Sequence, residues 1–136
     1  MDTQQMPADA DASGDCAFDV LAPRCPSRPV LEHITGRWGS LVLIALRESP
    51  ARFNELRRRV GGVSEKMLAQ SLHALERDGL VAREVHSTIP PRVEYSLTPL
   101  GARTAGKLWE LVLHLEDAMP QVLEAQQHYD ESTAAA

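Results

Sequence analysis

The sequence predicts a mainly α-helical domain with a small β-hairpin, and two patterns predict it. Residues 92–97 alternate apolar and polar side chains, as a half-buried strand does, and helical spacing begins at residues 98–99. Upstream, residues 53–60 predict a short helix, residues 61–62 a glycine turn, and residues 64–78 a second helix. Helix, turn, helix and two-stranded hairpin, in this order, are the parts of a winged helix-turn-helix.

Two further helices precede this unit. Residues 26–34 predict a short amphipathic helix that Gly36 ends, and the crowded apolar residues of 38–47 predict a helix buried on most sides. Ser49-Pro50 should end that helix, because the residue before a proline avoids the helical conformation. Residues 51–53 then enter the helix-turn-helix, in a short strand that can join the hairpin.

The second helix of the unit shows its core-facing side by its spacing. Leu68, Leu72 and Leu75 recur at i, i+4 and i+7, which places them on one face. Ser64 is the expected N-cap and Gly79 the expected C-terminal cap.

The last helix continues well beyond the winged helix-turn-helix. The first hairpin strand is expected at residues 80–85, and the last helix begins near Pro99. Its apolar stripe runs from Leu108 to Leu123, and Pro120 should kink or divide it. One small domain does not bury so long a stripe alone, so a homodimer is expected.

The distribution of charge favours a polyanionic partner even though the net charge is −5. Residues 1–19 carry five acids and residues 110–136 carry six, and neither segment has a Lys or Arg. Residues 20–109 hold all fourteen Lys and Arg against eight acids, a net charge of +6. The expected organisation is one domain over residues 20–130, between a flexible acidic N-terminal extension (1–19) and a flexible tail (131–136).

The same features argue against other classes of protein. The longest apolar run, residues 41–46, is too short to cross a membrane, and the N-terminus lacks the features of a signal peptide. With two cysteines and no export signal, the cytoplasm is the expected compartment. The chain has no glycine-rich phosphate loop, and its five histidines lack metal-ligand spacing. We therefore expect no enzyme activity, no cofactor and no metal.

The exposed face of the second helix supplies the best candidates for reading DNA bases. They are Ser64, Lys66, Met67, Gln70, Ser71, His73 and Arg77. The N-terminal residues of such a helix reach base edges in the major groove. Gln70 can pair with adenine and Lys66 with guanine, each through two hydrogen bonds. An ordinary solvated helix face is the alternative.

Two basic groups flank this helix. Arg57, Arg58 and Arg59 lie beside the turn, where phosphates pass, so at least one of them is expected to position the DNA backbone. On the hairpin, His86, Ser87 and Arg92 are further candidates. Arg92 has two open roles: entering a narrow minor groove, or pairing across the strands with Glu84.

The motifs together resemble the HxlR family, a branch of the MarR-like bacterial transcription regulators. The residues that carry the resemblance are Cys25-Pro26, Leu31, Ile34, Gly36-Arg37-Trp38, residues 53–57, Ser64, Met67-Leu68, residues 75–80 and residues 91–98. The family commonly has Gly-Lys-Trp where this chain has Gly36-Arg37-Trp38. The resemblance implies a homodimeric DNA-binding protein whose subunits meet through the first and last helices.

Cys25 is the one residue with reactive potential. If it is the N-cap of the first helix, the helix dipole and the nearby Arg24 and Arg28 should lower its pKa. Family members that sense oxidants or electrophiles use a cysteine in this region, so the resemblance adds a small oxidant or electrophile as an effector. Cys16 is a candidate partner for a disulfide. A small buried packing residue is the alternative for Cys25.

The leading hypothesis is a dimeric transcriptional regulator that binds double-stranded operator DNA with an inverted repeat. One rival is a winged-helix module that binds protein through the same surface. The other is a thiol-dependent redox enzyme, which the lack of a C-x-x-C pair disfavours.

Overall fold

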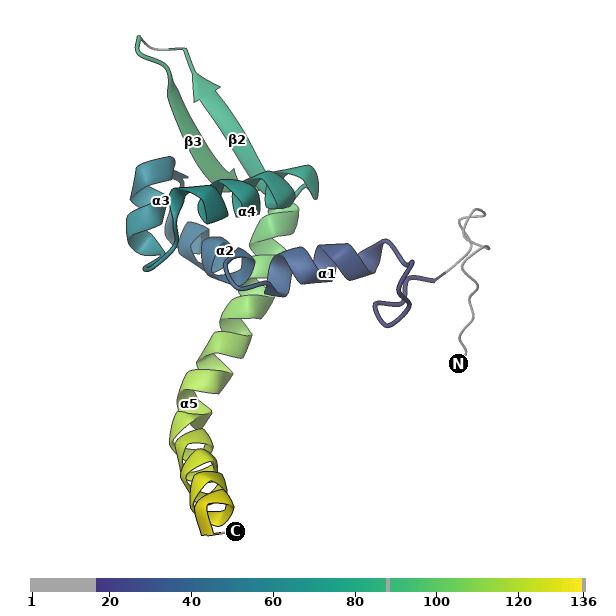
Figure 1. Ribbon diagram of the computed structural model, residues 1–136. Helices are drawn as coiled ribbons and strands as arrows, with labels where there is room; N and C mark the ends of the chain where they lie inside the picture. Colours follow the sequence, from purple (N-terminus) through teal and green to yellow (C-terminus); the bar gives the residue numbers. More distant parts are fainter. Residues whose placement is uncertain (1–16, 88, 136) are drawn as a thin grey trace.

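A computed structural model describes residues 17–87 and 89–135 of the chain and confirms a winged helix-turn-helix (Figure 1). The elements, in chain order, are α1 (Ser27–Thr35), α2 (Gly39–Glu48), β1 (Ala51–Arg52), α3 (Phe53–Arg59), α4 (Glu65–Arg77), β2 (Val81–His86), β3 (Arg92–Leu97) and α5 (Pro99–Ala135). Helices α2, α3 and α4 pack together, the β2–β3 hairpin projects from one side, and α5 extends away on the other. The expected acidic extension falls almost wholly on residues 1–16, which lie outside the described residues.

The core lies between α2, α3, α4 and the base of the hairpin. Its buried apolar residues are Val42, Leu43, Leu46, Ala51, Leu56, Val60, Val63, Leu68, Leu72, Leu75, Leu80, Val81 and Ala105. The predicted stripe of α4 is therefore confirmed, since all three of its leucines are buried. Burying a leucine stabilises the fold by about 1.5–3 kcal/mol, so this stripe holds α4 firmly against the rest of the unit.

Both ends of α4 are capped as the sequence predicts. The Ser64 hydroxyl accepts a hydrogen bond from the Met67 amide at 3.1 Å. At the other end Gly79 adopts a φ of +80°, the left-handed conformation that favours glycine. The Leu80 amide donates to the Leu75 carbonyl and the Gly79 amide to the Glu76 carbonyl, which is the Schellman arrangement. These caps set where α4 begins and ends.

The strands form one antiparallel sheet in the order β1-β3-β2. The short strand β1 pairs with β3, with Ala51 opposite Tyr95 and Arg52 opposite Glu94. The pairing confirms that residues 51–52 join the hairpin, and it ties α3, which follows directly, to the base of the wing.

Thr98 links the sheet to α5. Its hydroxyl donates to the Gly79 carbonyl at 2.7 Å and accepts from the Gly101 amide at 2.9 Å. Gly101 is needed here, because a Cβ at this position would lie 1.8 Å from the Leu80 carbonyl oxygen. The first turn of α5 is thus fixed against the start of β2.

Helix α5 is longer than predicted, and of the two effects expected of Pro120, a kink or a division, the division does not occur. The helix passes through Pro120 without being divided, because the loss of one backbone hydrogen bond leaves those on either side in place. Residues 131–135, expected as a flexible tail, continue the helix. No helix in the described residues combines the length and the apolar character that a membrane span requires.

A side-chain hydrogen bond connects α1 to the end of α4. His33 Nδ1 lies 2.6 Å from Asp78 Oδ2, and the Asp78 side chain is only 4% exposed. The two residues are 45 positions apart in the chain. This pair is a direct contact between α1 and the C-terminal cap of α4.

Candidate nucleic-acid interface and thiol site

The outward face of α4 carries the residues predicted to read DNA. Lys66, Met67, Gln70, His73, Arg77 and the cap Ser64 are exposed, and Ser71 is half-buried. Their common orientation follows from the buried leucines on the opposite side of the same helix. The face is polar, continuous and open to a partner; the assignment of individual bases to Gln70 and Lys66 stays a prediction.

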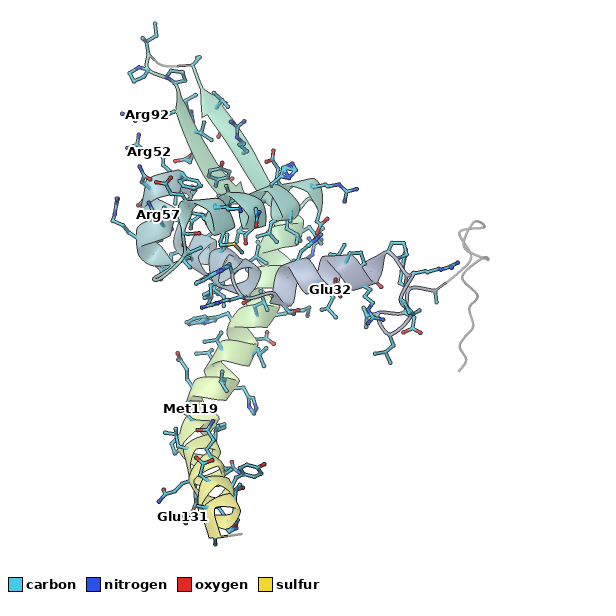
Figure 2. All side chains as sticks on the ribbon, viewed as in Figure 1. Glu32, Arg52, Arg57, Arg92, Met119 and Glu131 are labelled. Atoms are coloured by element: carbon cyan, nitrogen blue, oxygen red, sulfur yellow. The ribbon has the colours of Figure 1, made fainter. Side chains whose placement is uncertain are left out.

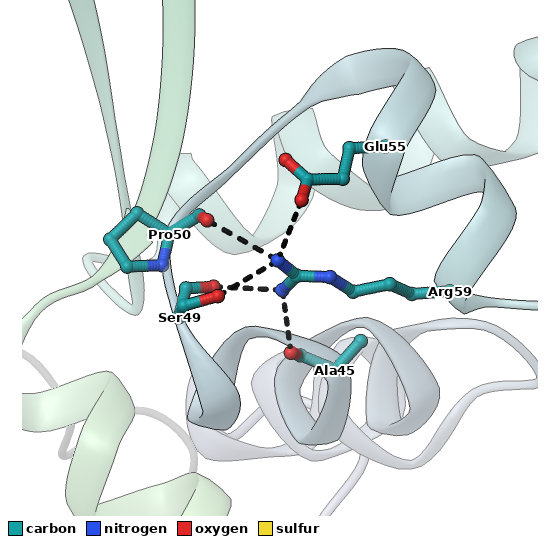
Figure 3. A network of polar contacts seen from close by, with 5 residues as sticks. All are labelled: Ala45, Ser49, Pro50, Glu55 and Arg59. Atoms are coloured by element: carbon teal, nitrogen blue, oxygen red, sulfur yellow. Dashed lines mark hydrogen bonds and ion pairs between the residues drawn. The ribbon is translucent and has the colours of Figure 1, made fainter.

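The arginine triplet divides into three different environments, and Arg59 has a structural role (Figure 3). Its guanidinium donates to the carbonyls of Ala45 and Ser49 at 3.1 and 2.8 Å, and to Ser49 Oγ at 2.8 Å. It also pairs with Glu55 at 3.1 Å and donates to the Pro50 carbonyl. The last carbonyls of a helix lack partners within that helix, so Arg59 satisfies the C-terminal end of α2.

The other two arginines face solvent more freely. Arg57 Nη1 pairs with Glu65 Oε2 at 3.1 Å, across the turn between α3 and α4. Arg58 is exposed, and no acid of residues 17–87 and 89–135 lies within ion-pair distance of it. Arg58 is therefore the member of the triplet with a free charge, and Arg57 is tied to the first turn of α4.

The hairpin register bears on one of the two roles that were open for Arg92, the pairing with Glu84. Arg92 lies opposite His86, whereas Glu84 lies opposite Glu94. No ion pair between Arg92 and Glu84 forms in the described part of the chain, so the predicted cross-strand pairing is wrong. The reason is that the register places the two glutamates, not a glutamate and an arginine, in direct opposition. Arg92 and Ser87 are exposed and His86 is half-buried.

The same register gathers three potential ligand groups that the sequence analysis did not connect. Glu84, His86 and Glu94 each offer a nitrogen or oxygen atom within 4.8 Å of the others. His86 Nε2 lies 3.6 Å from Glu94 Oε1. Spacing along the chain does not reveal this cluster, because Glu94 comes from the opposite strand. In this cluster the Glu94 carboxylate, which comes from β3, faces His86 of β2.

Arg52 is a basic residue of this surface that the sequence analysis missed. It is exposed at the end of β1, and with Arg58 and Arg92 it lines one surface hollow. Figure 2 labels Arg52 and Arg92 on the same side of the molecule, beside α3. An arginine in a two-residue strand has no sequence pattern that marks it as functional. Only the pairing of β1 with β3 brings it to the wing.

The thiol of Cys25 lies just before α1, held by hydrogen bonds. Contrary to prediction, Pro26 rather than Cys25 occupies the N-cap position, because α1 begins at Ser27, and no side chain caps this end of the helix. The Cys25 carbonyl accepts a hydrogen bond from the Arg28 amide. Cys25 Sγ accepts from the Ser27 hydroxyl at 3.3 Å and from the Asp19 amide at 3.1 Å. These bonds, that of the Ser27 hydroxyl first, lower the pKa of the Cys25 thiol below its ordinary value.

The cause of the lowered pKa differs from the predicted one. Hydrogen bonds to sulfur lower it, whereas partial burial and the charge of Asp19 oppose them. Arg28 is engaged elsewhere, donating to the Leu21 carbonyl at 3.2 Å and lying 4.0 Å from Glu32. Cys25 is half-buried, and its thiol forms no disulfide within the described residues. Cys16, its predicted partner, lies outside the described residues.

Comparison with known proteins places the chain among transcriptional regulators. Residues 33–123 match the model of the HxlR-like helix-turn-helix family. The HTH-type transcriptional regulator YtfH of Escherichia coli strain K12 is 55% identical over 105 residues, which are 77% of this chain and 83% of YtfH. The solved structure of the YtfH regulator of Salmonella typhimurium is 52% identical, covers 82% of this chain and 99% of its own, and superposes with a TM-score of 0.76. The redox regulator HypR in its reduced form is 35% identical over 74% of this chain and 98% of its own, with a TM-score of 0.65.

Proposed function

Because the chain belongs to the HxlR-like helix-turn-helix family of transcriptional regulators, we propose that it binds a specific operator as a homodimer. The observation that carries the proposal is α4, which is capped at both ends and buried through three leucines, and presents Lys66 and Gln70 to solvent. A rigid helix with an exposed polar face is what base reading in a major groove requires.

A second copy of the chain is the proposed cover for the apolar side of α5. Leu111, Leu115 and Leu123 are each about half exposed, and in Figure 1 the C-terminal part of α5 extends away from the other helices. Leu31 of α1 is also exposed. A row of exposed apolar side chains along one helix favours association with another protein surface. A dimer also explains how two α4 helices would address the two halves of an inverted repeat.

DNA binding is tested by the salt dependence of the affinity. The purified protein is titrated onto DNA from upstream of its own gene and onto random DNA of equal length. A dimer that neutralises about 6–10 phosphates should lose affinity by a factor on the order of 10³–10⁵ between 50 and 200 mM salt. An affinity that does not change with salt, or no binding to either DNA, would contradict the proposal and favour the protein-binding alternative.

The role of α4 as the reader is tested by Gln70→Ala. Loss of a two-hydrogen-bond contact to a base should cost about 1–3 kcal/mol on the operator and flatten discrimination at one position of each half-site. Gln121→Ala, the same substitution at an exposed position of α5, serves as a control away from α4. Equal losses on operator and random DNA would mean that Gln70 does not contact a base.

Regulation by oxidants is the second part of the proposal, with Cys25 as the sensor. Two observations support it: the hydrogen bonds that lower the pKa of its thiol, and the likeness to HypR, a redox regulator solved in reduced and oxidised forms. Thiolates react with oxidants, so a lowered pKa raises reactivity at neutral pH. Helix α1 contacts the end of α4 through His33 and Asp78. A shift of α1 would therefore move α4 as well.

The sensor is tested by measuring operator binding before and after treatment with peroxide, hypochlorite or a quinone. Cys25→Ser should bind the operator but ignore the oxidant, whereas Cys16→Ser should differ from wild type only if the two cysteines form a disulfide. Wild-type binding that is unchanged by every oxidant would make Cys25 a packing residue and leave the DNA-binding proposal intact.

A further inference from the structure

We propose that the hollow between β1, α3 and β3 is an anion site that receives a backbone phosphate of double-stranded DNA. Its cationic groups are Arg52, Arg58 and Arg92. The proposal rests on the DNA binding proposed above and adds a specific contact to it. The shared chemistry, a phosphate group, can also come from a small phosphorylated molecule, and the test separates the two sources.

Three separate elements bring the arginines together. Arg52 ends β1, Arg58 lies in the last turn of α3, and Arg92 begins β3. The β1–β3 pairing brings Arg52 and Arg92 to one side of the sheet, and α3 begins at the residue after Arg52. Asn54 also lines the hollow and adds a neutral hydrogen-bond donor. The convergence is therefore a product of the fold, not of a basic run in the sequence.

In the described part of the chain, no acid forms an ion pair with these arginines. Glu55 is the one acid in the lining, and its carboxylate is already paired with Arg59 at 3.1 Å. Glu94 lies opposite Arg52 in the sheet, but its carboxylate lies 3.6 Å from His86. Within residues 17–87 and 89–135, no acid lies within 4.0 Å of the three guanidinium groups. Cations that converge without a counter-charge attract an anion.

The size and place of the hollow favour a nucleic-acid backbone. Its volume of about 720 Å³ is larger than a single phosphate fills, so sugar and phosphate of a strand fit together. It lies between α3 and the wing, the two parts that flank α4. When a recognition helix enters the major groove, its flanking elements face the phosphates at the groove edge. A guanidinium suits such a contact because it can donate two parallel hydrogen bonds to one phosphate.

The test compares Arg52→Ala and Arg92→Ala with Arg83→Ala as a matched control. Arg83 is exposed on the same hairpin but lies opposite Tyr95, so it alternates to the other face of the sheet. Each hollow variant should weaken operator and random DNA alike, by roughly 3–10-fold at about 0.1 M salt, and reduce the salt slope by about 1. Arg92→Lys, which keeps the charge, should retain most of the slope. Unchanged thermal unfolding midpoints would show that the variants stay folded.

Three outcomes decide the proposal. Losses in Arg52→Ala and Arg92→Ala that exceed those in Arg83→Ala support it. Salt-dependent DNA binding by the wild type, with hollow variants no weaker than the control, overturns the site and leaves DNA binding standing. A third measurement titrates inorganic phosphate and pyrophosphate onto the protein without DNA. If the hollow variants lose affinity for these anions but keep their affinity for DNA, the hollow binds a small phosphorylated molecule and the proposed contact with DNA is overturned.

Discussion

At the scale of single residues, neighbouring side chains of one type have different tasks. Arg57, Arg58 and Arg59 are consecutive, yet Arg57 pairs with Glu65 and Arg59 caps the end of α2. Arg58 has no ion-pair partner among the described residues. A helix turns about 100° per residue, so three adjacent side chains meet three different environments. The sequence predicts that at least one of the three contacts the DNA backbone, and the contacts of the other two leave Arg58 as the candidate phosphate ligand of the triplet.

Arg59→Ala should therefore reduce the free energy of unfolding by about 1–2 kcal/mol, because carbonyls at the end of α2 lose a charged donor. The side chain is 21% exposed, so water replaces part of what is lost. Arg58→Ala, the matched control, should stay within about 0.5 kcal/mol of wild type. Urea unfolding at a fixed protomer concentration measures both. Equal effects of the two substitutions would contradict the structural role of Arg59.

Ser27→Ala should raise the pKa of Cys25 toward its ordinary value, since the Ser27 hydroxyl is the largest cause that lowers it. A lowered thiol pKa means that the thiolate forms at lower pH, so alkylation of the wild type should reach its plateau earlier as pH rises. In Ser27→Ala the inflection should move to higher pH and the rate at pH 7 should fall. Thr35→Ala, at the far end of α1, is the control and should react as wild type does. An inflection that Ser27→Ala does not move would separate the hydrogen bond from the reactivity.

At the scale of elements, close backbone contacts fix how helices meet. Gly39 lies where α2 starts against α1, and a Cβ there would lie 1.9 Å from the His33 carbonyl oxygen. Gly101 makes the equivalent contact between α5 and Leu80. Because backbone atoms cannot move aside as flexible side chains do, these glycines set the positions of α1 and α5 relative to the reading unit.

Gly101→Ala should destabilise the fold by about 1–3 kcal/mol or more, because the added methyl group overlaps the Leu80 carbonyl. Gly106→Ala in the same helix is the control, since a Cβ there meets nothing within 4 Å. In an open helical position, alanine should stabilise by up to about 1 kcal/mol. Thermal unfolding of the two variants should therefore change in opposite directions. A shift of the same sign and size in both would argue against the close approach.

At the scale of the whole molecule, one subunit leaves much of its longest helix uncovered. Only Gly101 and Ala105 are fully buried in α5, and both lie near its start. Leu108 still packs against the core, but further along the helix Leu111, Leu115 and Leu123 are each about half exposed. This incomplete burial is what a second subunit would complete, and the same association would set the distance between two α4 helices.

Leu111→Glu combined with Leu115→Glu should shift the protein to monomer or to insoluble chain, since two carboxylates would be buried at the proposed interface. The control, His114→Glu with Gln121→Glu, adds the same charges at exposed positions of the same helix. Sedimentation at micromolar concentration distinguishes the species. A folded wild-type monomer at that concentration would rule out the dimer.

The sequence by itself determined the elements and their order, and the outward face of α4. Those features follow from local physics: Leu68 and Leu72 lie one helical turn apart, Ser64 caps the next amides, and Gly79 takes a positive φ. The exposure of Lys66 and Gln70 then follows from the burial of the opposite side. Alternation along residues 92–97 similarly predicted β3.

Only the tertiary structure decided which charges are free and which meet across the chain. The register places Glu84 opposite Glu94, and the fold brings Arg52 and Arg92 to one hollow. Neither relation is visible in sequence spacing. The same holds for the Asp19 amide that donates to Cys25 and for the His33–Asp78 pair. Helical and strand periodicity describe one segment at a time, whereas ion pairs and anion sites depend on distances between segments. Those distances are fixed when the core packs.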